Sequence, residues 1–600
     1  MGLMTNPKAQ KIIEKVVLST YKPLSVLLYI GTFVAIVIVS SSLFSAKTYI
    51  SENALLPGLV ERQYKSTSDI NGYANYLEGI SKTDDDIPMA WLQQTFEEIG
   101  LDTYSQNFSA SHPFLNSPED VRGTNVFAIL RAPRIAGTEA VVFSIPYRGK
   151  ALEKEMGSTN HGIALMMSLA KHFIQQSYLS KDIIFLIVDK ENIGAQAWVE
   201  AYYDTSSDFL AKSPLHGRSG TIMAAINLEL PGRRIDHFDL RLEGLNGQLP
   251  NLDLFNVAVK LCEKEGVKAT FHGQGSLTHN ELRDNYGIRY TSKTMLSNML
   301  RQASGKPHGI HGLFLRYGIP ALTLHGIPSN SKKEIKATAS AISWKEYFAA
   351  STTYSNDFTS LFSSMFYLKQ RRRKSKDIDK DEPIGEEPKG QHHYVIPVLI
   401  GVHVCGLLLY LSPEFFVVNF SSYFGLPPTE ALVTGLGAVF TGVTLLQITS
   451  KRHNSDLNTD EDVKRKWMLL KCYALVWQAI SLLALSMINF SFAFLVGVFT
   501  IPVFVLCRPY RNFMSSGLYK LLLLLVSPPA ILFLLIAVHN HVFHGQSISL
   551  DLFMSAGNTA LNSIPQAVID QYLLNDWTFA VVCLVLFPSW QMFWICSAVK

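Results

Sequence analysis

The most constraining feature of this sequence is the series of long apolar runs that fills its last third. The region beyond Tyr394 is dominated by runs of about 18 to 22 apolar residues, the length at which an α-helix crosses the hydrocarbon core of a bilayer. The stretch from Thr48 to Lys345, in contrast, has the mixed composition of a globular domain. The sequence therefore predicts a membrane protein that carries one large soluble domain.

One apolar run lies near the N-terminus and the others follow the globular stretch. The predicted spans are Pro23–Phe44, Tyr394–Leu411, Ala431–Thr449, Trp467–Met487, Phe490–Val505, Leu518–Val538 and Phe579–Val599. The first run has no A-x-A cleavage pattern before Thr48, which predicts a retained signal anchor instead of a cleaved peptide.

Lysine and arginine predict the orientation of the chain, because positively charged flanks stay in the cytosol. Lys8, Lys11, Lys15 and Lys22 precede the first run, so the N-terminus is expected in the cytosol and the globular domain in the lumen. The sequon that begins at Asn107 agrees with that side and predicts a glycosylation site.

The charges of the later loops require one further crossing. Basic residues at 451–466 and 508–520 assign two loops to the cytosol, whereas 539–577 contains no lysine or arginine and is assigned to the lumen. Working backward places Lys369 in the cytosol. Either the weakly apolar residues 346–368 cross the membrane, or this chain lacks a helix at that place.

These assignments give a predicted domain organisation. In chain order it comprises a cytosolic tail at 1–22, a first span at 23–44, a luminal domain at 45–345, the weak crossing segment at 346–368, a charged cytosolic linker at 369–393 and a C-terminal bundle at 394–600.

Charge and cysteine content exclude some classes of protein. The formal net charge is only +4, and the basic residues form no patch large enough for nucleic acid, so nucleic acid is excluded as a partner. Cys262 is the sole cysteine of the globular stretch, so a disulfide within that domain is impossible. We expect this thiol to be a small buried hydrophobe.

The globular stretch alternates short apolar runs with amphipathic segments, a pattern typical of an α/β domain with a mostly parallel sheet. Strands are predicted at 125–130, 140–145, 182–188, 224–228 and 321–324, and helices at 162–176, 195–203 and 251–266. Because each unit needs its neighbours for burial, these segments are expected to form one domain.

Several long, irregular strings in this chain carry a family resemblance. They are Thr48–Ala54, Gly123–Val126, Glu243–Leu254, Arg301–Gly309 and His311–Tyr317. With these strings the chain resembles the anchor-attachment subunit of the glycosylphosphatidylinositol (GPI) transamidase complex. The resemblance extends over nearly the whole chain, although family members usually have eight spans.

The resemblance implies a noncatalytic subunit in the endoplasmic reticulum membrane that binds and presents the GPI lipid. Its implied partners are the other transamidase subunits, including a legumain-like cysteine protease, the GPI lipid and the substrate proproteins. It also points to Tyr49 and Ser51 as GPI-contacting residues. Just past the first span, both side chains can hydrogen-bond phosphate or sugar hydroxyls, although Tyr49 fits an ordinary interfacial aromatic residue as well.

The implied luminal domain resembles M28-type zinc aminopeptidases, which raises the alternative of a metallopeptidase or a metal-dependent peptide-bond-forming enzyme. Asp189, Glu229 and His311 retain usable ligand chemistry at strand and turn positions. However, Arg148 follows the strand where a ligand histidine would stand, and Gly157–Asn160 offers no bridging aspartate; His161 is a weaker substitute.

We therefore expect no metal, no cofactor and no catalytic residue in this chain. No Gly-x-Ser-x-Gly turn occurs, and Cys262 has no evident activating base. A transporter is disfavoured because the predicted spans carry almost no charged residues that could couple ion movement.

Overall fold

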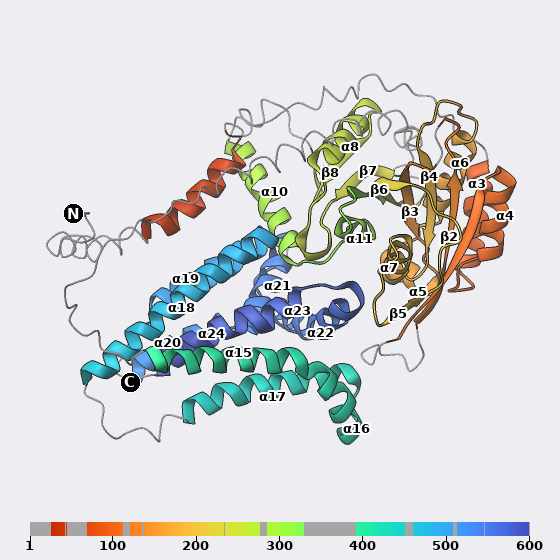
Figure 1. The fold of residues 1–600 in the computed structure, drawn as a ribbon. Helices are drawn as coiled ribbons and strands as arrows, with labels where there is room; N and C mark the ends of the chain where they lie inside the picture. Colours follow the sequence, from red (N-terminus) through yellow and green to blue (C-terminus); the bar gives the residue numbers. More distant parts are fainter. Residues whose placement is uncertain are drawn as a thin grey trace, which may run out of the picture.

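A computed structural model describes residues 26–41, 44, 69–111, 121–134, 137–232, 235–275, 285–328, 392–449, 460–507, 513–544 and 546–598. Figure 1 shows an α/β domain next to a group of long helices. Tyr49, Ser51, the tail 1–22, the weak crossing segment 346–368 and nearly all of the linker 369–393 lie outside the described residues.

The α/β domain is built on a ten-stranded mixed sheet with the order β5-β1-β2-β4-β3-β6-β10-β7-β8-β9. The strands are β1 (Asp102–Ala110), β2 (Val121–Leu130), β3 (Glu139–Pro146), β4 (Asp182–Val188), β5 (Leu210–Lys212), β6 (Thr221–Glu229), β7 (Ile235–Arg241), β8 (Lys268–Phe271), β9 (Gln274–Gly275) and β10 (Ala321–Pro328). All five predicted strands are confirmed.

The centre of the sheet is parallel, whereas its flanks are largely antiparallel. Strands β4, β3, β6 and β10 pair in parallel, but β2 and β1 join one side and β7 joins the other in antiparallel pairs. The central strands are continuous apolar runs because both of their faces are buried. The expected mostly parallel sheet is therefore found in the centre of a larger mixed one.

Alternate residues of the central strands face two separate cores. On β3, Val141 and Phe143 enter one core and Val142 the other. Helices α3 (Asp69–Ser81), α4 (Met89–Ile99), α6 (Asn160–Phe173) and α8 (Leu252–Lys264) contribute to the first core. Helices α7 (Glu191–Tyr202) and α11 (His311–Arg316) contribute to the second (Figure 1).

The C-terminal part is a bundle of long helices. It comprises α15 (His392–Phe415), α17 (Pro428–Thr449), α18 (Asp460–Ile488), α19 (Phe490–Val505), α20 (Phe513–Leu525), α21 (Pro528–His544), α22 (Leu550–Leu574), α23 (Thr578–Val581) and α24 (Phe587–Ala598). Three continuous helical stretches of the described residues are long and apolar enough to cross a membrane: Val395–Asn419, Trp467–Ile488 and Thr578–Ser597.

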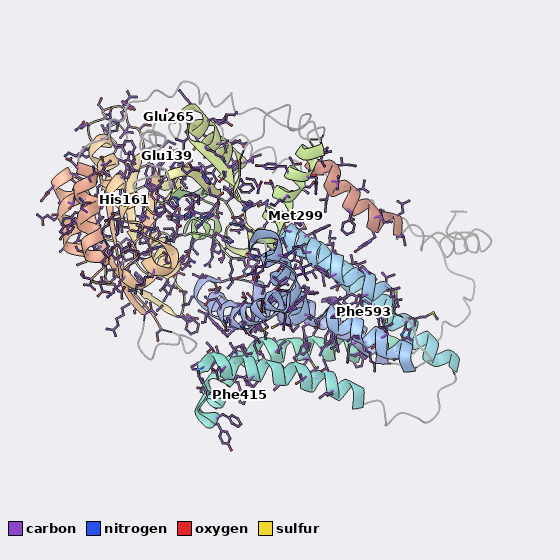
Figure 2. All side chains as sticks on the ribbon, turned by 180° about the vertical axis from the view of Figure 1, so that it is seen from behind. Glu139, His161, Glu265, Met299, Phe415 and Phe593 are labelled. Atoms are coloured by element: carbon purple, nitrogen blue, oxygen red, sulfur yellow. The ribbon has the colours of Figure 1, made fainter. Side chains whose placement is uncertain are left out.

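The stretch Thr578–Ser597 is the central helix of this bundle. In the most apolar 18 residues of this stretch, 67% of the residues are buried. The corresponding shares are 22% in Val395–Asn419 and 28% in Trp467–Ile488. Phe593 packs inside the bundle, while Phe415 lies at the far end of α15 (Figure 2). The remaining long helices thus expose apolar surface of the kind that lipid covers.

Two features of the bundle differ from the sequence prediction. The predicted span Leu518–Val538 is a bent pair, α20 and α21, with an angle of 60°. Pro528 and Pro529 lack the N–H groups that a continuous helix would need there. The predicted loop 539–577 contains α22, whose buried Leu552, Ala556 and Ala560 recur every four residues as in an amphipathic helix.

Candidate functional site

Polar side chains gather at the carboxyl ends of the central parallel strands, the edge where open α/β sheets bind ligands. Arg148 follows β3, Asp189 follows β4 and Glu229 ends β6. Arg148 and Glu229 are each only 2% exposed. Because buried charges require partners, the contacts of these groups determine what the edge can do.

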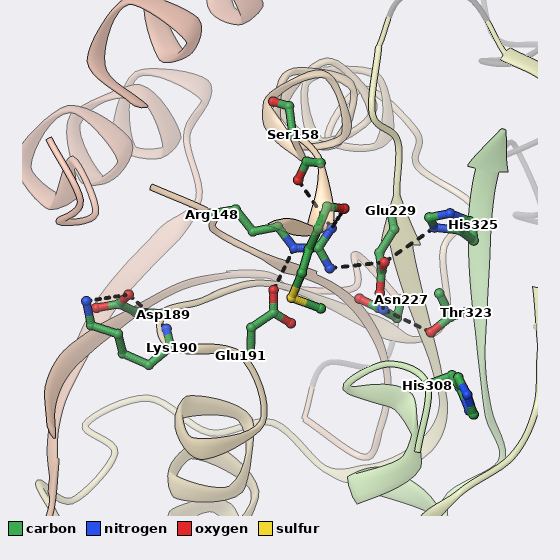
Figure 3. Close-up of polar contacts among 12 residues, drawn as sticks. Arg148, Ser158, Asp189, Lys190, Glu191, Asn227, Glu229, His308, Thr323 and His325 are labelled. Atoms are coloured by element: carbon green, nitrogen blue, oxygen red, sulfur yellow. Dashed lines mark hydrogen bonds and ion pairs between the residues drawn. The ribbon is translucent and has the colours of Figure 1, made fainter. Parts of the chain in front are cut away.

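The guanidinium of Arg148 lies between two carboxylates. Its Nε donates to Glu191 Oε1 at 2.6 Å, and its Nη2 donates to Glu229 Oε2 at 3.1 Å (Figure 3). Its Nη1 donates to the Met156 carbonyl at 3.1 Å. The planar guanidinium thus places its donors on three acceptors from three separate segments.

Glu229 is held ionised by its surroundings. Burial opposes the charge, but His325 and the cations Arg148 and Arg241 lower the pKa of Glu229 to about 2. Arg241 Nη1 lies 3.7 Å and His325 Nδ1 3.4 Å from Glu229 Oε2. The other oxygen, Oε1, accepts from Asn227 Nδ2 at 3.0 Å. Both oxygens of this carboxylate are therefore engaged by neighbouring groups.

Asp189 binds backbone N–H groups and does not contact Arg148 directly. Its Oδ2 accepts from the backbone N–H of Thr124 at 3.2 Å and its Oδ1 from that of Lys190 at 2.8 Å. Lys190 and Glu191 both have positive φ, 55° and 52°, which is costly for residues with a Cβ. Asp189 holds this sharp turn, and the turn places Glu191 beside Arg148.

His311 is linked to the Arg148 group through Thr323 and Asn227, because Asn227 Nδ2 donates to Thr323 Oγ1 at 2.9 Å as well as to Glu229 Oε1, whereas His161 lies apart from that group. His311 is fully buried, and its Nδ1 lies 2.7 Å from Thr323 Oγ1. His161 Nδ1 lies 3.5 Å from Glu78, in a part of the α/β domain remote from the bundle (Figure 2). Among the residues that the structure describes, no group of three or more His, Cys, Asp or Glu could hold a metal ion.

The residues at this edge do not fit a pair of zinc ions. A dication beside Glu229 would have to displace the guanidinium of Arg148 and stand close to Arg241 as well. Sequence reasoning recognised Arg148 but missed Glu191, Arg241 and His325. The available signal is a charged or titratable residue within or just after an apolar strand, because such a residue needs a buried partner. This signal applies to Arg148 and His325, but not to Glu191, which begins a helix, or to Arg241, whose strand carries other charged residues.

A second polar site joins the α/β domain to the bundle, and the string Glu243–Leu254 forms part of it. Asn246 N donates to the Gly305 carbonyl at 2.8 Å, and Asn246 Oδ1 accepts from Trp577 N at 2.7 Å. Gln302 Nε2 donates to the Gly247 carbonyl at 2.8 Å. Asn489 Nδ2, at the start of α19, donates to the Gln302 carbonyl at 2.8 Å.

Charged contacts reinforce this junction. Lys306 Nζ lies 2.9 Å from Asp570 Oδ2, and Arg316 Nη1 donates to the Leu574 carbonyl at 3.3 Å. Met299, near the end of α10 (Asn285–Ala303), marks the same region in Figure 2. Since the contacts involve the termini of α19, α22 and α23, they fix the domain at one end of the bundle.

Glu243 anchors the junction string from inside the α/β domain. Its Oε1 lies 2.9 Å from His272 Nε2, and both side chains are buried. Burial opposes the charge, but the contact with His272 lowers the pKa of Glu243 to about 2. Burial lowers the pKa of the neighbouring His308 to about 4. This string therefore begins at the buried contact between Glu243 and His272 and ends in the helix α8.

The first apolar helix packs against the same end of the molecule. Its described part, Val26–Ser40, is shorter than a full span. Tyr29 OH donates to the Val498 carbonyl of α19 at 3.0 Å, and Ser40 Oγ lies 2.9 Å from Ser292 Oγ of α10. The rings of Phe33 and Phe494 meet edge to face at 6.4 Å.

Asn107 and Cys262 occupy contrasting positions. Asn107 lies on β1 with an exposed side chain, and its Oδ1 accepts from Thr124 Oγ1 at 2.9 Å. Glycosylation there stays a prediction. Cys262 is 1% exposed, as expected, and burial raises the pKa of its thiol to about 12. A thiol of this kind is a poor nucleophile at neutral pH.

Among solved structures, this chain is similar to a glutaminyl cyclase of Porphyromonas gingivalis, with 13% identity over 47% of this chain and 98% of that one and a TM-score of 0.31. It is also similar to the LapA aminopeptidase of Legionella pneumophila, with 14% identity over 50% and 74% of the two chains and a TM-score of 0.31.

Similarity to curated sequences is more specific. The chain is 33% identical to the GPI transamidase component gaa1 of Schizosaccharomyces pombe over 46% of this chain and 47% of that relative. It is 29% identical to GPI transamidase component GAA1 of Saccharomyces cerevisiae over 50% and 46%. The matched regions thus span about half the length of each relative. The model of the family described as Gaa1-like, GPI transamidase component, matches residues 122–343 and 347–594.

Proposed function

Because this chain belongs to the Gaa1-like, GPI transamidase component family, we propose that it is a noncatalytic subunit of the GPI transamidase complex. In this role it binds and presents the GPI lipid and scaffolds the attachment of GPI to the C-terminus of substrate proteins. The proposal places it in the endoplasmic reticulum membrane, with several spans and the α/β domain in the lumen.

The observation that carries the noncatalytic assignment is the position of Arg148 between Glu191 and Glu229. A hydrolytic zinc site needs open coordination positions and a carboxylate free to accept a proton. Here a buried guanidinium lies against the carboxylates, and Glu229 is held ionised by cations. The cleavage and acyl-transfer chemistry therefore belongs to a partner, which we propose is a legumain-like cysteine-protease subunit.

To present a lipid, the protein must hold the α/β domain in a fixed position relative to the membrane surface, where the lipid head group lies. The contacts of Asn246, Gln302 and Asn489 supply such a relation, because they join the domain to the ends of bundle helices. A nucleophilic amine held in one orientation reacts as if at a high effective concentration. We propose that Tyr49 and Ser51 contact the GPI head group near the helix Val26–Ser40.

The test uses cells that lack the endogenous family member and display a GPI-anchored reporter. We expect Tyr49→Phe and Ser51→Ala to reduce anchoring, because each loses a hydroxyl. Tyr49→Trp separates the alternatives: an interfacial aromatic role would be preserved by tryptophan, whereas head-group recognition would not. Asp189→Asn is expected to leave anchoring intact at equal protein amounts.

Metal analysis of the purified, active complex provides an independent measurement. We expect no stoichiometric zinc attributable to this chain. Tightly held zinc, together with loss of anchoring in both Asp189→Asn and Glu229→Gln at normal protein amounts, would instead establish a metalloenzyme and overturn the noncatalytic assignment.

A further inference from the structure

A cleft of about 430 Å³ lies where the α/β domain meets the bundle. One wall is the loop around Phe209, just before β5, and the other is formed by Tyr410 of α15 and the C-terminal end of α22. The size is that of a small-ligand site, and interfaces between structural units are common places for such sites. The apolar stretch Thr578–Ser597 begins directly after Trp577 of this cleft, at the boundary between the bundle and the α/β domain.

Aromatic side chains give the cleft its shape. Phe209 and Tyr572 meet edge to face with ring centroids 5.4 Å apart, across the junction of the two parts. Tyr410 and Trp577 complete the aromatic set, and the Trp577 side chain is 48% exposed. Aromatic rings with polar edges suit ligands that have both an apolar face and hydrogen-bonding groups.

Two acceptor atoms in the lining have no hydrogen-bond partner among the described residues. Asp576 is 1% exposed, and its Oδ1 accepts from Thr578 N and Oγ1 at 2.9 and 2.7 Å, but its Oδ2 is unsatisfied. Gln571 Nε2 donates to Tyr410 OH at 2.9 Å, whereas Gln571 Oε1 is unsatisfied. A buried acceptor without a donor is destabilising, so both atoms call for a ligand that donates hydrogen bonds.

The charge of the lining excludes one class of ligand. Asp208 and Asp576 line the cleft, and no described lysine or arginine does. A phosphate, sulfate or carboxylate group would therefore meet acidic side chains, and the nearby cations Lys306 and Arg316 are already engaged by Asp570 and the Leu574 carbonyl. The favoured ligand is neutral or cationic, carries several donors and has one apolar face. A pyranose ring has these properties, since its C–H face is apolar and its edge carries hydroxyl groups.

We propose that this cleft binds one sugar ring, a hexose or a hexosamine, stacked on the aromatic side chains with its donors directed to Asp576 Oδ2 and Gln571 Oε1. The sugar ring can belong to the glycan of the lipid anchor, a source that rests on the proposed function, or to an N-linked glycan on a neighbouring glycoprotein. A free amino group distinguishes the first source, because the sugar linked to inositol carries one, whereas N-linked glycans carry N-acetylated hexosamines.

The test measures saccharide binding to the purified full-length protein in a detergent without a sugar head group, by saturation-transfer NMR. The probes are methyl α-mannoside, glucosamine, N-acetylglucosamine and, as an anionic control, glycerol phosphate. We expect saturation by at least one saccharide and none by glycerol phosphate. Preference for glucosamine favours the anchor glycan, and preference for N-acetylglucosamine favours the N-linked source; both support the site.

Two variants and a matched control locate the binding. Trp577→Ala removes an aromatic wall but keeps the backbone N–H that donates to Asn246, and it should weaken saccharide binding about tenfold. Asp576→Asn keeps an acceptor for Thr578 but replaces Oδ2 by a donor, and it should weaken glucosamine most. Tyr423→Ala, at a ring that is 83% exposed outside the cleft, should change nothing.

Two results would overturn this inference: no saturation by any of the saccharides, or equal binding by wild type and Trp577→Ala. Neither depends on transamidation, so the reporter assay can fail while the sugar site stands. Conversely, the noncatalytic subunit role survives if the cleft binds no sugar.

Discussion

The side-chain oxygen of Asn246 accepts a hydrogen bond from the backbone N–H of Trp577 at 2.7 Å, although 331 positions separate the two residues. Asn246 has a φ of 59°, in the left-handed region that asparagine tolerates better than most residues. Asn575, the residue that ends α22, has a φ of 55°. Two left-handed residues thus meet where the α/β domain contacts the bundle, and asparagine occupies both positions.

Replacing Asn246 by alanine should loosen this junction. Asn246→Ala leaves the Trp577 N–H without its acceptor and places a less tolerant residue at positive φ, a loss of about 1–3 kcal/mol. Asn246→Asp keeps the acceptor and should retain most of the stability. Thermal unfolding and limited proteolysis of the full-length protein measure the effect. An Asn246→Asp variant as unstable as Asn246→Ala would contradict the assigned hydrogen bond.

Gly247→Ala should damage the junction more than a matched substitution elsewhere. A Cβ at Gly247 would lie 2.2 Å from Asn489 Nδ2 and 2.9 Å from the Gln302 carbonyl oxygen, whereas a Cβ at Gly266 would meet no atom within 4 Å. Both glycines have positive φ, 76° and 70°, so the backbone strain of alanine is similar at the two sites. The difference in melting temperature between Gly247→Ala and Gly266→Ala therefore reports the steric contact alone. Equal losses would show that both Asn489 and the Gln302 carbonyl move away freely, and would contradict a tightly packed junction.

Arg148→Met should destabilise the α/β domain strongly. Removing the guanidinium leaves the buried Glu229 and the half-buried Glu191 without this partner, and a broken buried pair costs about 3–5 kcal/mol. The double variant Arg148→Met/Glu229→Gln should regain part of this loss.

Arg218→Ala, which breaks a solvent-exposed pair with Asp204, should cost under about 1 kcal/mol. Denaturant unfolding measures all three; similar losses for Arg148→Met and Arg218→Ala would refute the importance of the buried group.

The α/β domain should lose stability in two stages as the pH falls. Burial lowers the pKa of His308 and His311 from 6.5 to about 4, so their native neutral forms stabilise the fold fully above pH 6.5 and less as the pH falls to 4. The pKa values of Glu229 and Glu243 are lowered from 4.5 to about 2, so their contribution is lost between pH 4.5 and 2.

The unfolding free energy measured against pH tests this expectation. In the upper stage each histidine can contribute a slope of up to about 1.4 kcal/mol per pH unit. His311→Gln should reduce the slope between pH 6.5 and 4, because it removes one of the two buried histidines. A stability that does not change across that interval would contradict the neutral buried state of these histidines.

Part of the site could be read from the sequence and part could not. The position of Arg148 after β3 and the lack of a carboxylate at Gly157–Asn160 were visible in the residues themselves. The partners of Arg148 were not, because Glu191 reaches it through a turn of two left-handed residues that no local pattern requires. The helix α22 was also missed, since its amphipathic spacing is weaker than the apolar signal of the neighbouring runs.

By itself, the sequence determined the division into an α/β domain and a helical bundle, the central strands and the buried state of Cys262. These three features follow from the length of apolar runs, from hydrophobic periodicity and from residue type. All of these are local properties that extend over a few helical turns or one strand. Only the tertiary structure decided that Arg148 lies between Glu191 and Glu229, and that Asn246 meets Trp577. Such contacts depend on strand order, register and the docking of segments hundreds of positions apart, and local periodicity carries no information about them.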